Sequence, residues 1–183
     1  MIKKTVKTLA FLLVILFSNQ ANAWSFGEWI DGIKAGSESA WNDGDYELYV
    51  PFIEWHNRLT YDKEKYERYN EYPLGLGIGK GYWDGDEWHG LMFMVFEDSN
   101  HHPQTIGGYS YLTHWNLNEA ETWKFGVGYA LTLTQRSEYK FIPLPLPLPV
   151  ASLNYKSISL QAAYVPGIKN DGNVLFAWVK WTF

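Results

Sequence analysis

Residues 123–134, with the sequence WKFGVGYALTLT, show a clear alternation of side-chain type. The odd positions, from Trp123 to Leu133, are large and apolar, and the even positions are small or polar. Side chains alternate between the two faces of a β-strand, whereas an α-helix would mix the two sets around its circumference. The segment is somewhat longer than the roughly 9 to 11 residues that cross a bilayer at a tilt. The pattern predicts a membrane-spanning strand.

A strand in lipid has to pair its backbone N–H and C=O groups, because each unpaired group costs several kcal/mol there. One spanning strand therefore implies a closed ring of strands. The sequence predicts an all-β fold, an eight-stranded antiparallel transmembrane β-barrel, which is the smallest size usual for such barrels. Besides residues 123–134, the predicted strands are residues 46–61, 74–83, 88–96, 106–115, 150–155, 158–165 and 174–183.

The connections between the predicted strands alternate in length along the chain. In outer membrane barrels, short turns face the periplasm and long loops face outward. This pattern would place both chain termini on the periplasmic side. The short connections are residues 84–87, 116–121 and 154–157, and the longer ones are residues 62–72, 97–105, 137–149 and 167–173.

The first 23 residues have the pattern of a secretory signal peptide. Three lysines precede a short apolar run, and Ala21-Asn22-Ala23 follows with small residues at the two positions that a signal peptidase reads. The apolar run is too short for a transmembrane helix. We expect residues 1–23 to be removed and the mature chain to begin at Trp24.

The mature chain, residues 24–183, is predicted to be a single outer membrane barrel domain. Apolar residues between Trp24 and Trp41 are separated by charged ones, at a spacing that favours an amphipathic α-helix over residues 24–42. Three glycines weaken this helix, and a loosely ordered lead-in is the alternative interpretation. Residues 46–183 would then form the barrel.

Composition narrows the possible functions. Aromatic residues make up 18% of the chain, including 10 Trp and 13 Tyr, which suits a barrel with aromatic girdles, although a soluble all-β binding protein is also consistent with it. The net charge of −5 becomes −8 without the three lysines of the expected signal peptide, which argues against nucleic acid binding. The absence of cysteine excludes disulfides and thiolate metal sites.

Small residues occupy the predicted inner faces of several strands. They would leave space inside the barrel, and an apolar cavity that opens into a bilayer would accept an acyl chain. Filling of this space by neighbouring aromatic side chains is an equally good interpretation. The small residues are Gly75, Gly77, Gly79, Gly107, Gly108, Ser110, Gly126, Gly128 and Ala130.

Four prolines lie within predicted strands or at their ends. Pro51 lies within the first strand, Pro73 precedes the second, Pro149 starts the sixth and Pro166 ends the seventh. Each proline removes a backbone donor from the strand ladder. Two neighbouring strand pairs would therefore have weakened seams, through which a lipid could pass sideways, although strand termination alone explains at least two of the four prolines.

Four blocks of the chain are residues 46–73, 96–99 (FEDS), 141–155 (FIPLPLPLPVASLNY) and 164–183. Together they resemble the PagP family of outer membrane lipid A palmitoyltransferases, and the similarity runs from about Trp24 to Phe183. The resemblance implies an eight-stranded barrel with a periplasmic amphipathic helix, in the outer membrane of a Gram-negative bacterium. It further implies that a palmitoyl group leaves a glycerophospholipid and joins a hydroxyl of a lipid A acyl chain.

The same resemblance implies that His56, Asp98 and Ser99 are the catalytic residues. Our hypothesis is that His56 is the general base, that Asp98 orients it, and that Ser99 stabilises the oxyanion or positions a substrate. A Ser99 nucleophile that forms an acyl-enzyme is the competing mechanism. Without the resemblance, a single His in a strand and an Asp-Ser pair at a loop start are most often structural.

Two further residues are candidates for substrate binding. The floor of the family's acyl-chain cavity has a Gly-Tyr-Gly sequence, where this chain has Gly108-Tyr109-Ser110. The hydroxymethyl group of Ser110 would exclude the end of a long chain by steric contact, so we expect a chain shorter than palmitoyl or a weakened preference for palmitoyl. Arg136 either contacts lipid A phosphates or anchors the barrel rim, and the anchor is the favoured interpretation.

Two other classes of function remain open at this stage. A lipid A deacylase or an outer membrane phospholipase would use similar groups but would pass the acyl chain to water. A non-catalytic adhesion or anchoring barrel would need neither interior space nor clustered catalytic residues. No motif calls for a cofactor, and adjacent His101 and His102 have no third ligand at a spacing that suits a metal. We expect a monomer, because a closed ring has no free strand edge.

Overall fold

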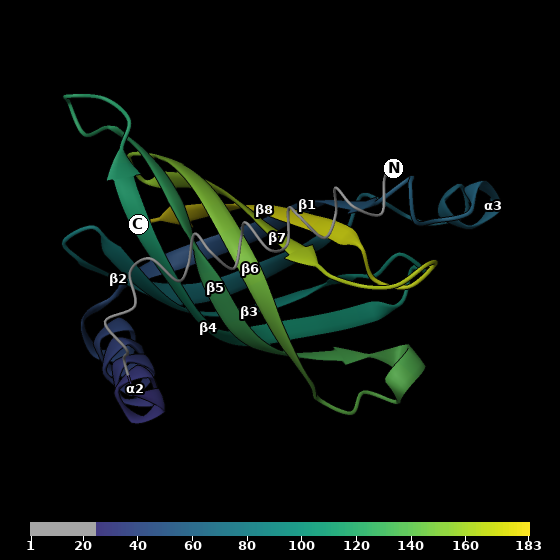
Figure 1. Cartoon of the computed structure of the whole chain (residues 1–183), viewed down its shortest axis with the longest axis horizontal. Helices are drawn as coiled ribbons and strands as arrows, with labels where there is room; N and C mark the ends of the chain where they lie inside the picture. Colours follow the sequence, from purple (N-terminus) through teal and green to yellow (C-terminus); the bar gives the residue numbers. More distant parts are fainter. Residues whose placement is uncertain (1–24) are drawn as a thin grey trace. The chain divides into compact units, whose positions relative to one another are not determined.

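The computed structural model describes residues 25–183, so the expected signal peptide and Trp24 lie outside the described residues. Helix α2 (Phe26–Asp43) precedes eight strands, and two short elements, α3 (Lys63–Tyr66) and η1 (Ser137–Tyr139), lie in the loops (Figure 1). The strands are β1 (Asp45–His56), β2 (Gly75–Asp84), β3 (Glu87–Glu97), β4 (Pro103–Asn116), β5 (Trp123–Arg136), β6 (Leu144–Tyr155), β7 (Ile158–Val165) and β8 (Val174–Thr182).

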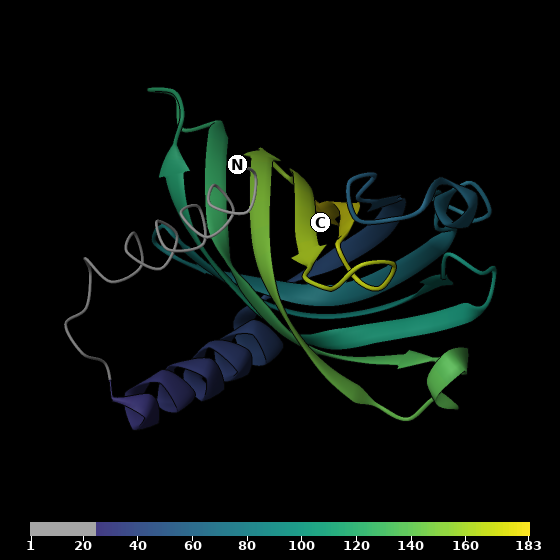
Figure 2. The same ribbon diagram turned by 45° about the vertical axis from the view of Figure 1, so that its right-hand side comes forward.

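Each strand pairs in antiparallel fashion with its neighbour in sequence, and β1 pairs with β8 to close the ring. Figure 2 shows the strands curving around a common interior. This topology confirms the predicted eight-stranded antiparallel barrel with an N-terminal helix. Between residues 25 and 183, no helix is both long enough and apolar enough to span a membrane.

Helix α2 begins with a capping box. The hydroxyl of Ser25 accepts a hydrogen bond from the backbone N–H of Glu28 at 3.2 Å, and the Glu28 carboxylate accepts one from the backbone N–H of Ser25 at 2.7 Å. Gly36, in the second half of the helix, allows a close approach to β3 and β4. A Cβ atom at this position would lie 2.2 Å from Nδ1 of His89 and 2.7 Å from the hydroxyl of Tyr109.

The first strand ends at His56 rather than at Tyr61 as predicted. Asn57 forms a turn directly after it: its carbonyl accepts from the backbone N–H groups of Thr60 and Tyr61, and its side chain accepts from that of Leu59. Asn side chains commonly stabilise such turns. The apolar residues after His56 therefore belong to a loop, and the prediction of a strand over residues 57–61 is wrong.

The sixth strand begins at Leu144, six residues before its predicted start. The intervening residues contain Pro145, Pro147 and Pro149, which we had assigned to a loop. Prolines at alternate positions all lack the N–H group on the same edge of a strand. Pairing with β5 continues along the other edge, from Tyr155 as far as Leu144. A strand with one unpaired edge thus tolerates these prolines.

The outward-facing side chains of the strands are largely apolar. On β2, for example, Leu76 and Ile78 are exposed while Gly77 and Gly81 are buried. Aromatic residues gather on the outside near the short turns, where Trp123 packs on Tyr155 and Trp181 packs on Phe183. Other exposed apolar side chains on the strands are Val50, Phe52, Phe93, Val95, Leu133, Leu153, Leu160, Leu175 and Val179.

Side chains from neighbouring strands fill the space beside the β2 glycines. A Cβ atom on Gly77 would lie 2.2 Å from Cγ of Met94, and one on Gly79 would lie 2.8 Å from Cε2 of Tyr49. At the level of the short turns, the buried ammonium of Lys180 donates to Glu47 and lies 4.1 Å from the ring centroid of Trp88. This half of the barrel interior is packed.

Two seams of the barrel have short ladders. Within the described chain, the β1–β2 ladder has only five residue pairs, up to Tyr49, and the β6–β7 ladder has six, up to Val150, whereas the β4–β5 ladder has thirteen. Pro51 and Pro149 lie next to the unpaired stretches of β1 and β6, and the register of β1 against β8 shifts between Pro51 and Ile53. Pro73 precedes β2 and Pro166 follows β7, so all four prolines border these two seams.

Candidate active site

A cavity of about 440 Å³ lies inside the barrel, at the end that carries the long loops. Its lining contains both apolar and polar side chains, so it combines space for a hydrocarbon chain with groups that can carry out chemistry. The apolar side chains include Phe96, Ile106, Leu146, Leu148, Val165 and Phe176, and the polar ones include Glu54, His56, Ser99, Gln104 and Arg136.

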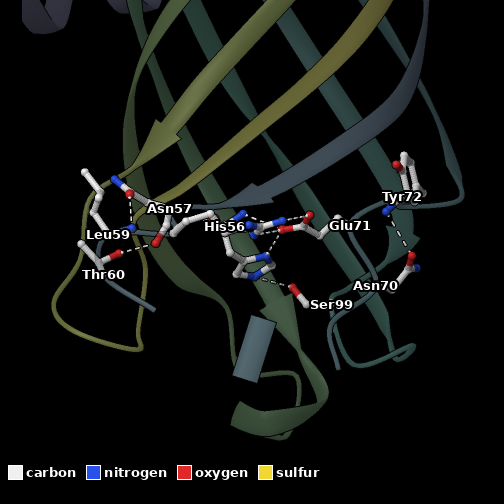
Figure 3. A network of polar contacts seen from close by, with 9 residues as sticks. His56, Asn57, Leu59, Thr60, Asn70, Glu71, Tyr72 and Ser99 are labelled. Atoms are coloured by element: carbon white, nitrogen blue, oxygen red, sulfur yellow. Dashed lines mark hydrogen bonds and ion pairs between the residues drawn. The ribbon is translucent and has the colours of Figure 1, made fainter. Parts of the chain in front are cut away.

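The side chains of His56 and Ser99 meet at the mouth of this cavity. His56 is the last residue of β1 and Ser99 follows β3, so pairing of both strands with β2 brings the two residues to the same end of the barrel. Nε2 of His56 lies 3.1 Å from Oγ of Ser99 (Figure 3). Both residues are buried. This is the hydrogen-bond contact that a base needs with a hydroxyl.

The other ring nitrogen of His56 contacts Glu71, from the loop between β1 and β2. Nδ1 lies 3.2 Å from Oε1 of Glu71, and the same oxygen accepts the backbone N–H of His56 at 2.9 Å (Figure 3). We had expected Asp98 to orient His56. The structure corrects this expectation, because the carboxylate at Nδ1 belongs to Glu71.

Asp98 instead stabilises the turn that carries Ser99. Its fully buried carboxylate accepts through Oδ1 from the backbone N–H groups of Asn100, at 2.8 Å, and His102, at 3.0 Å. Its Oδ2 atom lies 3.6 Å from Nη2 of Arg136. Asp98 therefore connects the shape of the Ser99 turn with the position of an arginine that lines the cavity.

Arg136 links two carboxylates at the rim. Besides Asp98, its Nη2 atom lies 3.5 Å from Oε2 of Glu138, and Glu138 in turn accepts from the side chain of Asn100. These contacts agree with an anchoring role. Arg136 also lines the cavity, and its buried Nε atom has no hydrogen-bond partner among residues 25–183.

Three acceptor atoms near Arg136 are likewise buried without a hydrogen-bond partner within the described part of the chain, although one of them, Oδ2 of Asp98, faces Arg136 in an ion pair. They are Oε2 of Glu54, Oδ2 of Asp98 and Oε1 of Gln104. Buried polar atoms in proteins nearly always have a hydrogen-bond partner, which can be water or a ligand. Glu54 and Gln104 line the cavity together with Arg136, and their unpartnered atoms indicate a site that receives polar groups of a ligand.

Glu71 is ionised at neutral pH. Although burial opposes ionisation, hydrogen bonds from Arg58 and from His56 lower the pKa of the Glu71 carboxyl to about 2. Arg58 binds this carboxylate in bidentate fashion, with Nη1 and Nη2 each 2.5 Å from one oxygen. Paired contacts of this kind are among the strongest hydrogen bonds in proteins.

Comparison with known proteins identifies the family. The model of a family described as "Antimicrobial peptide resistance and lipid A acylation protein PagP" matches residues 37–180. The chain belongs to the PagP family. This membership agrees with the resemblance in the sequence blocks around His56 and Ser99 and with the closed barrel.

Individual PagP-family relatives match over most of their length. The lipid A acyltransferase PagP of Proteus mirabilis is 49% identical over 150 residues, which cover 81% of this chain and 71% of that protein. The protein of the same name from Citrobacter koseri is 41% identical over 184 residues, covering 99% and 98% of the two chains. Among solved structures, the Yersinia pestis outer membrane protein Ail aligns with a TM-score of 0.42 and 10% identity over 77% of this chain and 100% of its own.

Ser110, the other substrate-binding candidate, is buried but does not line the cavity. Ile106 lies on the cavity wall, and Ser110 is four residues, or about 14 Å, further along β4. The buried side chains of Met94, Ala130 and Trp178 belong to the packed core of the barrel. In this structure the cavity therefore ends before it reaches the predicted floor.

Glu71 and Arg58 belong to the site but were not predicted from the sequence. One signal was present: Glu54, His56 and Arg58 occupy alternate positions, as residues on one face of an extended chain do. No such periodicity connects His56 to Glu71, which lies fifteen residues later in a loop. The described residues also contain no group of three or more His, Cys, Asp or Glu side chains that could hold a metal ion.

Proposed function

We propose that this chain is an outer membrane enzyme that transfers an acyl group from a glycerophospholipid to a hydroxyl of lipid A. Family membership supports the acceptor and the reaction class, because the matched relatives are named lipid A acyltransferases. The observation that carries the proposal is the contact between His56 and Ser99 in a cavity lined by both apolar and polar side chains.

Placement in a bilayer is supported by the outer surface of the barrel. A closed ring of strands with exposed apolar side chains is suited to lipid. Each strand pairs with a neighbour on both sides, and the apolar outer side chains do not require contact with water. The aromatic pairs near the short turns suit one membrane interface. The cavity then opens at the level of the other interface, on the side of the long loops, which we assign to the outer leaflet where lipid A resides.

The transfer exchanges one ester for another. In the route that the contact with Ser99 favours, Oγ of Ser99 attacks the ester carbonyl of the donor while Nε2 of His56 takes its proton. The carbon–oxygen bond to the lysophospholipid breaks, and its oxygen receives that proton. The lipid A hydroxyl then attacks the acyl-Ser99 ester, passes its proton to His56, and releases Ser99 with that proton. The net change is one ester bond broken and one formed.

The two short-ladder seams are suitable places for lipid to pass between the bilayer and the cavity. Leu146, Leu148 and Val165, which border the β6–β7 seam, also line the cavity. We propose that Pro149 and Pro166 keep this seam open, and that Pro51 and Pro73 do the same between β1 and β2. Because the closed ring leaves no strand edge for pairing with another copy, we propose that the enzyme acts as a monomer.

The test is an assay of the refolded protein with a phospholipid labelled in its acyl chain, with and without lipid A. The proposal predicts that the labelled acyl chain is transferred to lipid A when lipid A is supplied. It also predicts labelled Ser99 when donor is supplied alone. Free labelled fatty acid would indicate a phospholipase instead, loss of an acyl chain from lipid A itself would indicate a deacylase, and absence of turnover would indicate a non-catalytic barrel.

Two variants make the assay specific to the site. His56→Gln removes the proposed base, whereas His101→Gln makes the same change in the exposed loop after Ser99, where the His101 ring contacts Glu97. We expect loss of transfer in the first variant and normal transfer in the second. Equal activity in both variants would contradict the assignment of the site.

A further inference from the structure

The backbone of the loop between β1 and β2, residues 57–74, contacts both Ser99 and the end of the strand that carries His56. The backbone N–H of Asn70 donates to the carbonyl of Ser99 at 2.9 Å, and the carbonyl of Glu71 accepts the backbone N–H of Glu54 at 2.9 Å. The side chain of Asn70 accepts the backbone N–H of Tyr72 at 3.0 Å, which fixes the local turn. Residues 70 and 71 therefore connect the end of β1 with the turn after β3 (Figure 3).

The same loop surrounds the ring of His56. The ring of Tyr69 lies 4.6 Å from the His56 ring, and that of Tyr61 lies 5.0 Å away in an edge-on arrangement. The Glu71 carboxylate then approaches the ring in contact with Nδ1. Two rings and one carboxylate from a single loop thus restrict both the position and the rotation of the imidazole.

Arg58 fixes the carboxylate in turn. Its guanidinium binds both oxygens of Glu71, donates to the backbone carbonyl of His56 at 2.8 Å, and stacks 4.2 Å from the ring centroid of Tyr66. The geometry of this ion pair fixes which atom of the carboxylate faces His56.

We propose that Glu71 is a positioning residue that fixes the His56 tautomer with its proton on Nδ1, and that Arg58 holds Glu71 in place for this purpose. An ionised carboxylate only accepts hydrogen bonds, so the ring nitrogen that faces Glu71 has to be the donor. Nε2 is then left with a lone pair directed at Oγ of Ser99, 3.1 Å away. The role rests on the proposed acyl transfer, and the carboxylate also stabilises the imidazolium that forms during it.

The substitution Glu71→Gln tests this role, with Glu67→Gln as its matched control. Both make the same chemical change in the same loop, but Glu67 forms an exposed ion pair with Lys63. Gln keeps the size of Glu and supplies N–H donors, which can stabilise the opposite tautomer. Correctly folded barrel is isolated for each variant, and kcat and KM are measured for transfer from labelled phospholipid to lipid A.

We expect Glu71→Gln to lower kcat by roughly 10²- to 10⁴-fold, the range in which a mispositioned histidine base affects catalysis, with KM changed less than about 3-fold. Glu67→Gln should leave both constants unchanged. A decrease in kcat below about 3-fold for Glu71→Gln would overturn the proposal. So would an equal loss in the control.

A second measurement reads the tautomer directly and does not depend on activity. Nitrogen-15 NMR of the protein labelled at its histidines reports which ring nitrogen carries the proton, and His56→Gln identifies the His56 signals among those of the five histidines. We expect an Nδ1-protonated ring in the unchanged protein and loss of that state in Glu71→Gln. An Nε2-protonated ring in the unchanged protein would overturn the proposal.

The two measurements separate this proposal from the proposed function. If the unchanged protein shows the expected tautomer but transfers no acyl group to lipid A, the positioning contact stands and the function fails. If Glu71→Gln does not yield folded barrel, Arg58→Gln is used in its place. This variant keeps Glu71 and removes only the guanidinium that binds its carboxylate. A lower kcat with a mixture of tautomers in Arg58→Gln supports the proposal, and normal values of both overturn it.

Discussion

Both ends of the barrel interior contain buried acidic side chains, but the hydrogen-bond partners of these side chains differ between the two ends. At the short-turn end, the Glu47 carboxylate accepts hydrogen bonds from Lys180, Tyr49 and Thr182. At the long-loop end, the carboxylates of Glu54 and Asp98 each have one oxygen without a hydrogen-bond partner among the described residues. The contacts of Glu47 are supplied by the protein, whereas Glu54 has an oxygen without a hydrogen-bond partner among the described residues and lies at the wall of the cavity.

This difference shows why burial of charge alone does not identify a functional site. A buried charged group whose hydrogen bonds are all supplied by the protein has no position left for a ligand. Its removal therefore lowers the stability of the fold. A buried polar group with an unused hydrogen-bond position next to a cavity can gain a partner when a ligand binds. We therefore expect substitutions at the long-loop end to change activity and those at the short-turn end to change stability.

The largest effect is expected for His56→Gln. Removal of the proposed base should lower the rate of acyl transfer by roughly 10²- to 10⁴-fold, the usual contribution of a general base. The free energy of unfolding should change little, because the amide of Gln can still contact Ser99 or Glu71. Transfer kinetics and denaturant unfolding of the same preparation check both statements, and a loss of activity matched by loss of the fold would remove the contrast between the two ends.

Glu47→Gln should have the opposite result. It leaves the buried ammonium of Lys180 without its carboxylate partner, which costs about 3 to 5 kcal/mol when a buried pair is broken. Denaturant unfolding in detergent measures this cost. The fraction of protein that remains folded should transfer acyl groups at the normal rate, and a selective loss of kcat would show that the short-turn end takes part in catalysis.

A smaller effect is expected from pH. The pKa of Glu71 is about 2 in the folded chain, against 4.5 for an unperturbed carboxyl. Because the folded-state pKa is the lower one, ionised Glu71 favours the folded state; this contribution is complete above about pH 4.5 and is lost as the pH falls toward about 2.

The pH effect is measured as the difference between two unfolding curves. The stability of the unchanged protein should fall more steeply between about pH 5 and pH 2 than that of Glu71→Gln, which has no carboxyl to titrate at this position. Parallel pH dependences in the two proteins would show that the contacts of Glu71 with Arg58 and His56 do not form in solution.

The smallest effect is expected for Ser110→Gly. Our sequence-based expectation is a transferred chain shorter than palmitoyl or a weakened preference for palmitoyl. Since Ser110 lies beyond the cavity, its substitution should lengthen the chain only slightly, while Phe176→Ala, at the cavity wall, should have the greater effect. Mass spectrometry of the modified lipid A reports the chain length. Strict palmitate addition by the unchanged protein would refute the expectation.

Much of the fold followed from the sequence. The alternation in residues 123–134 is characteristic of a strand with one apolar face. The predicted order of short and long connections is wrong at one place, because residues 98–102, between β3 and β4, form a shorter connection than residues 117–122, between β4 and β5. The start of β6 could not be predicted in the same way. Prolines at alternate positions are compatible with a strand only if one of its edges is unpaired, and that condition depends on where β7 ends.

The site was predictable only in part. Resemblance to a known family singled out His56 and Ser99, and the structure brings these two side chains together. The partner expected for His56 was of the right chemical type but was the wrong residue. Asp98 turns its carboxylate to the backbone of its own loop, and Glu71 reaches His56 through a loop conformation that leaves no periodic signal in the sequence.

The most direct test of acyl transfer at the long-loop end is the mass of lipid A from a Gram-negative host that produces this protein. Our proposal predicts lipid A heavier by one ester-linked acyl chain in cells with the unchanged protein, and unmodified lipid A in cells with an equal amount of folded His56→Gln barrel. Unmodified lipid A in the presence of the folded, unchanged barrel would contradict it, as would the same added chain in cells that carry His56→Gln.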